Sequence, residues 1–549
     1  MEEVNNFYIN FFNFKCRYFQ KELWEKINKN EFPLLIRAST GSGKTEAVLA
    51  PFLSQFIDKN FFIAPRLIYV LPMRVLVNSI AQRIKKYAER ISPHITVEVQ
   101  HGDLPNSPFF IADIVVTTLD QFLYGFARSS HQVGRHIDVP AGAIASSLVV
   151  FDEAHMYRDE FTFAIMRALM EILHKSNIPF IVMTATMPKS LEDSLFENID
   201  IDEGRKIIGK IDLNSTLKIT LCEEPLVRGN EVNFSDELLQ KIKSKKTLII
   251  LNQVSRAQKV YEEIKKRLDL EENEIVLLHS QFTRKDREKH ETRALSLMPH
   301  REDGKIIKPE GTGIVVSTQV LEAGIDFSAE LLLTELAPAD SLVQRAGRCA
   351  RYEGEKGEMI IFHVEDDNGH LPYKKEHLEK TSEWLQNNSN FNIKNFNEVC
   401  SFVDATLDYK ANDYEARDTL IDLYECVLYA DSKPSNIQVR EGKPITLVVV
   451  NLSIGEGRKK EERIKDAINK TNIRDNSISV DFRVGWRLLK DGVLKYKINF
   501  DQEKGLEIQE VKDKKKDKKK DISPFSYYLL ESDYYDELKG VVPDAGYFI

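Results

Sequence analysis

Residues 38–45 read Ala-Ser-Thr-Gly-Ser-Gly-Lys-Thr, and these residue types at this spacing are typical of a phosphate-binding loop. The apolar run Leu34–Ala38 predicts a buried strand before the loop, and Glu46 opens a stretch that predicts a helix. Backbone N–H groups at such a turn and helix start attract phosphate oxygens. Lys44 can reach the outer phosphates of ATP, and the Thr45 hydroxyl can hold Mg²⁺. The predicted ATP-binding residues of the loop are Ser39, Thr40, Gly41, Ser42, Gly43, Lys44 and Thr45.

A pair of carboxylates follows a second apolar run. Asp152-Glu153-Ala154-His155 comes directly after Ser147–Phe151. Asp152 is placed to hold the metal ion, and Glu153 to orient or deprotonate the attacking water. The alternative is a helix whose first turn is acidic to suit its dipole. The position downstream of a phosphate loop, at the end of an apolar strand, favours the catalytic interpretation.

Polar residues also follow other apolar runs in the same half of the chain. Thr184 and Thr186, with His155, are predicted to couple hydrolysis to lobe movement. Arg74 and Thr118 are suited to contacts along a nucleic-acid backbone, which position a strand without reading its sequence. Each of these residues alone is more typical of ordinary loop chemistry than of function, and it is their fixed order on one face that favours the functional interpretation. Gln20 is predicted either to read an adenine edge or to lie at the surface before a helix.

Two more clusters lie in the second half of the chain. Thr318 is a candidate nucleic-acid contact, and Gly324 and Asp326 are candidate nucleotide contacts, with Asp326 near the ribose. The segment Gln344–Arg351 carries three arginines, which we expect along one side of a helix and its approach. A planar, permanently charged guanidinium suits a γ-phosphate, so Arg348 and Arg351 are predicted to be catalytic. Gln344 is added to them because it opens the Gln-x-x-Gly-Arg pattern. The alternative is a basic surface helix.

The elements that must position these residues alternate between strands and helices in two series. Nearly continuous apolar strands separated by helical stretches indicate a doubly wound parallel sheet, in which ligands lie at the carboxyl ends of the strands. The predicted strands of the first series are 34–38, 67–71, 95–99, 113–117, 147–151 and 180–184, and those of the second are 247–252, 275–279, 313–318, 331–335 and 358–363. A weakly patterned break at 190–240 separates the series, and 298–313 is expected to form a surface loop.

Beyond residue 366 the pattern weakens. Helices are predicted at 373–386 and 414–428, and strands at 445–452 and 480–488. The lysine run 512–520 is expected to form a solvated loop, with a phosphate-contacting flap as the alternative. The aromatic residues near the C-terminus are expected to form the core of a small domain.

Charge, cysteine spacing and the length of apolar runs limit the classes of protein to which this chain can belong. The 549 residues carry a formal net charge of −9, so nucleic-acid contacts must come from local patches. The five cysteines lie far apart, which favours a reducing compartment over disulfides. There is no signal-like N-terminus and no apolar run of membrane-spanning length, so we expect a cytoplasmic protein.

Taken in order, these motifs resemble those of superfamily-two helicases with two RecA-like lobes. Residues 152–157, 317–326 and 336–348, and more weakly Tyr535–Glu537, are similar to the signature helicase of type I CRISPR systems. The expected fold is α/β, with two tandem RecA-like doubly wound parallel-sheet lobes and a smaller α+β C-terminal domain. The expected domains are 1–212, 213–365, a helical linker at 366–440, and 441–549.

The resemblance implies an ATP- and Mg²⁺-dependent translocase that moves 3′ to 5′ on single-stranded DNA. It also implies recruitment by an RNA-guided CRISPR surveillance complex. Many members of that family carry an HD nuclease domain, usually N-terminal. In this sequence the phosphate loop begins near residue 38, and no His is directly followed by Asp. We therefore expect the stand-alone form, with a separate HD nuclease subunit. The alternatives are an RNA helicase of the same superfamily and a non-catalytic ATP-dependent clamp.

Overall fold

The computed structural model places the chain in two units, residues 1–214 with 387–441 and residues 215–386 with 442–549. It describes residues 2–549 except 40, 103, 158–159, 210–213, 303–304, 323–324, 365–367, 409–417, 419–424, 426–443, 453–459, 502–504, 512–521, 524–525 and 543–549. The predicted helix 414–428 and the lysine run 512–520 lie largely or wholly outside the described residues. No helix within the described ranges is both long and apolar enough to cross a membrane.

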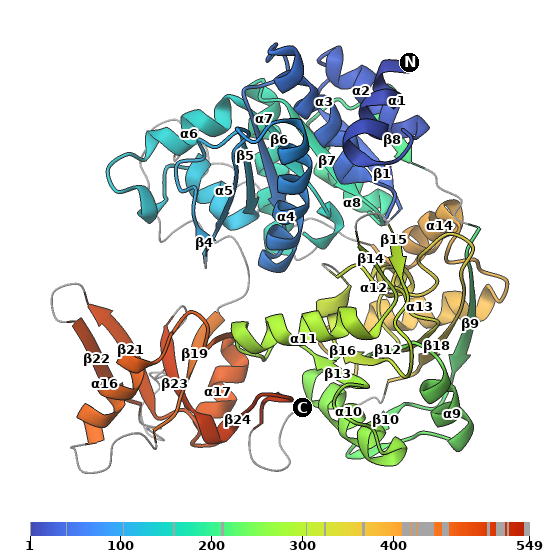
Figure 1. The fold of residues 1–549 in the computed structure, drawn as a ribbon, viewed down its shortest axis with the longest axis vertical. Helices are drawn as coiled ribbons and strands as arrows, with labels where there is room; N and C mark the ends of the chain where they lie inside the picture. Colours follow the sequence, from blue (N-terminus) through green and yellow to red (C-terminus); the bar gives the residue numbers. More distant parts are fainter. Residues whose placement is uncertain are drawn as a thin grey trace. The chain divides into compact units, whose positions relative to one another are not determined.

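The first unit is built on an eight-stranded sheet in the order β4-β3-β5-β2-β6-β7-β1-β8 (Figure 1). All neighbours pair in parallel except β3 and β4. The six predicted strands are present, and three have the predicted bounds. The strands are β1 (Leu34–Ala38), β2 (Arg66–Leu71), β3 (Val97–His101), β4 (Leu104–Pro105), β5 (Ile114–Thr118), β6 (Ser147–Phe151), β7 (Phe180–Thr184) and β8 (Lys206–Gly209).

Helices cover this sheet and set the positions of its strand ends. A large apolar core joins β2, β5, β6 and β7 to the helices that follow β5 and β6. The main helices are α2 (Tyr18–Asn28), α3 (Lys44–Asp58), α4 (Arg74–Ile91), α5 (Leu119–Phe126), α6 (Asp138–Ala145), α7 (Glu160–Lys175) and α8 (Lys189–Leu195). Helix α14 (Phe396–Thr406) also belongs to this unit, because Asp404 accepts from the Lys189 N–H and Arg37 contacts Cys400.

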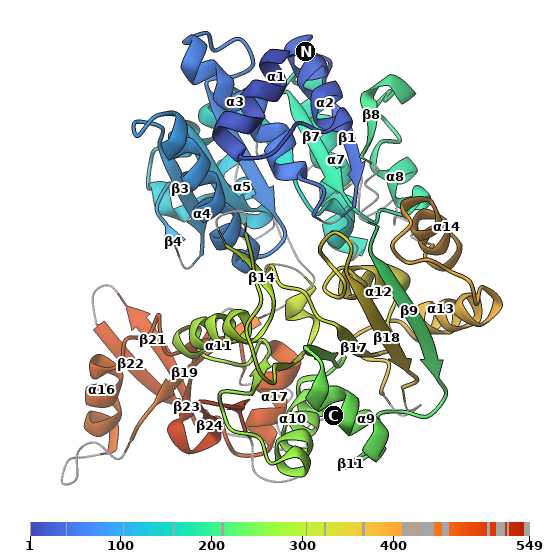
Figure 2. The ribbon, with the colours of Figure 1, turned by 45° about the vertical axis from the view of Figure 1, so that its right-hand side comes forward.

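The second unit contains a fully parallel six-stranded sheet in the order β13-β16-β12-β17-β18-β9 (Figure 2). All five predicted strands of the second series are present within one or two residues of the predicted bounds. The strands are β9 (Thr216–Cys222), β12 (Thr247–Ile250), β13 (Ile275–Leu278), β16 (Ile314–Ser317), β17 (Leu331–Glu335) and β18 (Lys356–Phe362). The helices are α9 (Asp236–Ser244), α10 (Val254–Leu268), α11 (Arg284–Leu297), α12 (Ala339–Ala346) and α13 (Lys375–Asn387).

The same unit carries a five-stranded mixed sheet with strand order β20-β19-β23-β21-β22. Buried residues on its two faces form two separate apolar cores, as expected for a domain with its own core. The elements are β19 (Pro444–Val450), α16 (Lys460–Lys470), β20 (Ser477–Asp481), α17 (Phe482–Lys490), β21 (Tyr496–Asp501), β22 (Gly505–Glu510), β23 (Tyr527–Glu531), β24 (Tyr535–Asp536) and β25 (Gly540–Val541).

Three predictions about secondary structure are wrong. The predicted strand 480–488 is mostly helix α17, because Asp481 caps a helix by accepting from the Arg483 N–H. The break at 190–240 supplies the sheet-edge strands β8 and β9. The predicted loop 298–313 contains a hairpin, β14 (His300–Glu302) and β15 (Lys305–Ile307).

Candidate nucleotide and nucleic-acid site

The predicted phosphate loop lies between the end of β1 and the start of α3. Gly41 and Gly43 have φ values of 78° and 82°, a left-handed backbone that glycine adopts without strain. The Lys44 ammonium folds back onto the loop and lies 3.0 Å from the Ala38 carbonyl oxygen. Thr40 lies outside the described residues. The loop therefore has the strand, turn and helix that a phosphate cradle requires.

Gln20 is completely buried, so the predicted alternative of a surface position is wrong. Its amide donates to the Gly43 carbonyl oxygen at 3.0 Å and accepts from the Arg17 N–H at 2.9 Å. Arg17 also donates to the Ser42 carbonyl oxygen. Helix α2 is thus tied to the phosphate loop through Arg17 and Gln20. The contact of Gln20 with adenine stays a prediction.

The two residues predicted to hold the metal ion face one another across a tyrosine. The buried Tyr69 hydroxyl lies 2.6 Å from Asp152 Oδ2 and 3.3 Å from Thr45 Oγ1. Burial raises the pKa of Asp152 to about 6, as does the charge of Glu153, against the opposing effects of Lys44 and Tyr69. A desolvated carboxylate beside a hydroxyl suits a hard cation such as Mg²⁺, so Thr45 and Asp152 fit the predicted metal.

The remaining residues of the acidic motif form a short polar chain at the ends of β6 and β7. Glu153 has φ 52°, an uncommon value for a residue with a side chain, and it directs its carboxylate to within 3.6 Å of His155 Nδ1. The same nitrogen lies 3.1 Å from Thr184 Oγ1. Among the described residues, buried Thr186 Oγ1 has no hydrogen-bond partner. Of the predicted coupling residues, His155 therefore contacts the Glu153 carboxylate directly and Thr184 contacts it through His155, whereas Thr186 makes no such contact.

Sequence reasoning missed Tyr69 and Arg83. Arg83, from α4, donates to Thr45 Oγ1 at 2.6 Å and lies 3.6 Å from the Glu46 carboxylate. Tyr69 was not identified as a site residue because it lies inside an apolar run, where a tyrosine is typical of the core. A buried phenol needs a hydrogen-bond partner, which is the one signal that could have drawn attention to it. No pattern in the sequence indicates that Arg83 reaches the phosphate loop.

The predicted nucleic-acid contacts differ in exposure. Arg74 is exposed at the start of α4, and its guanidinium lies against Gly102, where a Cβ would come within 2.9 Å. Thr118 is fully buried at the end of β5, and within the described chain its hydroxyl has no hydrogen-bond partner. Thr318, at the end of β16, is 2% exposed. All three occupy carboxyl ends of strands or the turns that follow, as predicted.

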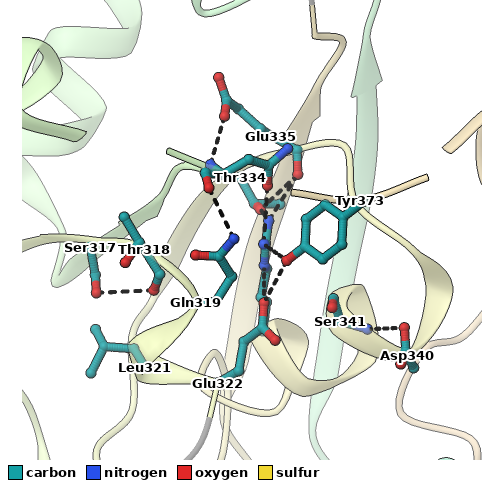
Figure 3. A network of polar contacts seen from close by, with 12 residues as sticks. Ser317, Thr318, Gln319, Leu321, Glu322, Thr334, Glu335, Asp340, Ser341 and Tyr373 are labelled. Carbon is teal, nitrogen blue, oxygen red and sulfur yellow. Dashed lines mark hydrogen bonds and ion pairs between the residues drawn. The ribbon is translucent and has the colours of Figure 1, made fainter. Parts of the chain in front are cut away.

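Arg345, in helix α12 beside the second sheet, is fully buried at the centre of a polar network. Figure 3 labels four members of this network, which are Glu322, Thr334, Glu335 and Tyr373. The five N–H donors of Arg345 are all used: Nε donates to Glu322 at 2.9 Å, and the two Nη atoms donate to the acceptors that follow. These are Thr334 Oγ1, the Glu335 carbonyl oxygen, Asn252 Oδ1 and the Tyr373 hydroxyl. Arg345 therefore has no donor left for a phosphate.

The expectation that three arginines share one side of a helix is wrong, because α12 ends at Ala346 and contains only Arg345. Arg348 is 5% exposed and donates to the carbonyl oxygens of Leu321 and Glu322. Arg351 donates to Asp326 at 2.6 Å. Partial burial acts to raise the pKa of Asp326, but the charges of Arg351 and Arg348 outweigh it and hold that pKa below its usual value.

The other predicted residues of this half are only partly described. Gln344 is buried in α12 with 8% exposure. Gly324 lies outside the described residues, so the structure describes neither its backbone nor its surroundings. Asp326 is half exposed at its side chain. The structure thus brings Asp326, Arg348 and Arg351 together and places Gln344 in the neighbouring helix.

Two family models match this chain, one over the first parallel sheet and one over the second. Residues 17–194 match the DEAD/DEAH box helicase family, and residues 243–354 match the family described as CRISPR-associated nuclease/helicase Cas3, C-terminal. Two parallel sheets with this loop and these motifs define a superfamily-two helicase. Within that superfamily, the second match and the relatives below make the chain similar to Cas3-type helicases.

Known proteins extend the comparison. A CRISPR-associated helicase Cas3 from Thermoproteus tenax is 30% identical over 384 residues, which are 67% of this chain and 62% of the relative. Cas3 of T. fusca with AMPPNP matches with a TM-score of 0.69 at 19% identity, over 98% of this chain and 71% of that one. A CRISPR RNA-guided surveillance complex, pre-nicking, contains a chain that matches with a TM-score of 0.60 at 18% identity, over 96% and 67%. This chain thus spans less than two thirds of its Thermoproteus relative.

Proposed function

We propose that this chain is an ATP-dependent translocase and helicase that moves 3′ to 5′ on single-stranded DNA during CRISPR interference. The observation that carries the proposal is the cluster of Thr45, Tyr69 and Asp152 beside the phosphate loop. The Thr45 hydroxyl and the desolvated Asp152 carboxylate both lie within hydrogen-bond distance of the Tyr69 hydroxyl, and both are of the kind that holds a nucleotide-bound Mg²⁺. Magnesium supplies charge neutralisation at the phosphates when it is bound.

Each residue has a proposed part in hydrolysis. Lys44 binds the outer phosphates, and Gln20 contacts the base from helix α2, which is tied to the loop. Glu153 orients or deprotonates the attacking water, and its carboxylate lies 3.6 Å from His155 Nδ1. Arg348 and Arg351 neutralise charge that develops on the γ-phosphate, with Gln344 in support. Permanent charge and planar geometry suit both arginines to this role.

Arg74, Thr118 and Thr318 are proposed to contact the nucleic-acid backbone. His155, Thr184 and Thr186 are proposed to pass the state of the nucleotide site to those contacts. The hydrogen bond between His155 and Thr184 supports this role, because it joins the acidic motif to the end of β7. Contacts to backbone phosphates do not depend on sequence, as translocation requires.

We further propose recruitment by an RNA-guided surveillance complex, because the family match and the matching chain in such a complex point to that setting. Cutting of the DNA is assigned to a separate HD-type subunit.

ATP hydrolysis with matched DNA and RNA tests the substrate. Single-stranded DNA should stimulate hydrolysis by the purified chain more than RNA of the same sequence. A partial duplex with a 3′ single-stranded tail should be unwound, and one with a 5′ tail should not. Stimulation by RNA alone would indicate an RNA helicase instead. Nucleotide binding without turnover on either nucleic acid would indicate a non-catalytic clamp.

A further inference from the structure

The solvent-facing side of helix α17 carries one tryptophan among three cations. Arg483, Trp486, Arg487 and Lys490 are spaced i, i+3, i+4 and i+7, so they share one face of the helix. All four are exposed, and Trp486 has an exposed fraction of 44%. We call these four residues the α17 stripe. The stripe extends over about 10 Å of helix axis.

The opposite side of α17 fixes this orientation. Gly485 and Leu488 are buried against the five-stranded sheet. A Cβ at Gly485 would lie 2.1 Å from Ile445 Cδ1, so the backbone of the helix approaches the sheet as closely as it can. Asp481 caps the helix and prevents fraying of its first turn. The helix cannot rotate to bury Trp486 without losing this contact.

The charge of the stripe contrasts with that of the chain. The whole protein has a formal net charge of −9, whereas the stripe gathers three cations around one indole. Lys490 Nζ lies 5.5 Å from the centre of the Trp486 ring, within the range of a cation–π contact. Asp481 lies 2.9 Å from Arg483 Nε, and both side chains are well exposed, so solvent screens this pair.

We propose that the α17 stripe is a contact site for single-stranded nucleic acid. Trp486 stacks on a base, and the three cations contact the phosphates on either side of it. An exposed aromatic ring within a cationic strip is the combination that holds a single strand without reading its sequence. This site is separate from the backbone contacts assigned to Arg74, Thr118 and Thr318. The inference rests on the proposed function, because it presumes a nucleic-acid substrate.

Binding of the full chain to fluorescent oligothymidylate tests the stacking contact. The variant Trp486→Ala should raise the Kd about 5- to 100-fold, as expected for loss of one base–aromatic stack. Trp486→Phe should retain most of the affinity, because phenylalanine also stacks. The matched control is Phe500→Ala, which removes another exposed aromatic ring from the same sheet domain and should leave the Kd unchanged.

Salt dependence tests the cations. The double variant Arg483→Glu, Arg487→Glu should lower the slope of log affinity against log salt by about 1.4, from two lost phosphate contacts. The control is Lys243→Glu, Lys266→Glu, which makes the same charge change at exposed positions of α9 and α10 and should keep the slope.

Wild-type affinity and slope in the stripe variants would overturn the inference, as would equal losses in the controls. The latter result would point to a non-specific charge effect. If single-stranded DNA stimulates ATP hydrolysis by the wild-type protein while the stripe variants bind that DNA with normal affinity, only this inference fails. If DNA does not stimulate the wild-type protein, the proposed function fails first. Photocross-linking of bromouracil-substituted DNA to Trp486 in the wild-type protein gives a second, independent readout.

Discussion

The three arginines of the segment 344–351 illustrate how similar residues take different parts. Their types and spacing predicted arginines for phosphate contacts, and that pattern is readable without a structure. Burial distinguishes them. All five N–H donors of Arg345 bind acceptors within the lobe of the six-stranded sheet, whereas Arg351 pairs with a half-exposed Asp326. Tyr69 was missed for the related reason that a phenol in an apolar strand looks like core. Sequence gives the residue types of a site, but hydrogen-bond partners distant along the chain leave no local pattern.

Replacing Arg345 should therefore mainly lower stability, whereas replacing Arg351 should mainly lower ATP turnover. Arg345→Met leaves the buried Glu322 carboxylate without its cation and should lower the free energy of unfolding of its lobe by about 3 to 5 kcal/mol. Arg351→Met removes a pair whose Asp326 carboxylate is half exposed to solvent, and it should cost less, about 1 kcal/mol. The same Arg351 variant should lower stimulated ATP turnover about 10³-fold, as expected for an arginine finger. Denaturant titration and steady-state hydrolysis measure the two effects, and a reversed pattern would contradict these assignments.

At the scale of elements, continuous apolar runs predicted the central strands well because strands covered on both faces are apolar throughout. Edge strands are covered less, and the half-exposed β9 therefore looked like a charged break. The strand predicted at 480–488 has a clear cause: Val480, Phe482, Val484, Trp486 and Leu488 alternate with period two. Tertiary packing and the Asp481 cap override that alternation and leave Trp486 outside the core.

The close packing of Gly485 in α17 against Ile445 of the sheet predicts the effect of substitutions there on stability. Gly485→Ala would normally stabilise a helix, but here the added methyl group meets Ile445, so we expect a loss of about 1 to 3 kcal/mol of stability. Ile445→Val removes the nearest atom. The double variant should be more stable than the sum of the two single effects predicts. Thermal and urea unfolding of the four proteins measure this coupling, and simple additivity would show that the helix has room to move.

At the scale of the whole molecule, the second unit joins its six-stranded lobe to the C-terminal sheet domain. His279 Nε2 lies 2.8 Å from the Lys539 carbonyl oxygen, His290 Nε2 lies 2.9 Å from that of Glu537, and the Tyr535 hydroxyl donates to Asp286 at 2.8 Å. The sequence predicted two separate domains here. Contacts with main-chain carbonyls could not be foreseen, because any residue supplies that acceptor.

The central claim, that the phosphate loop and the acidic motif form one ATP-hydrolysing site, is tested most directly by Glu153→Gln. This change keeps the size of the side chain and removes the base. Stimulated turnover should fall about 10²- to 10⁴-fold, the usual contribution of a general base, while ATP still binds. Lys44→Ala is the companion variant and should lose ATP binding as well. The measurement is ATP hydrolysis with saturating single-stranded DNA, alongside equilibrium binding of ATP. Near wild-type turnover in Glu153→Gln would contradict the account.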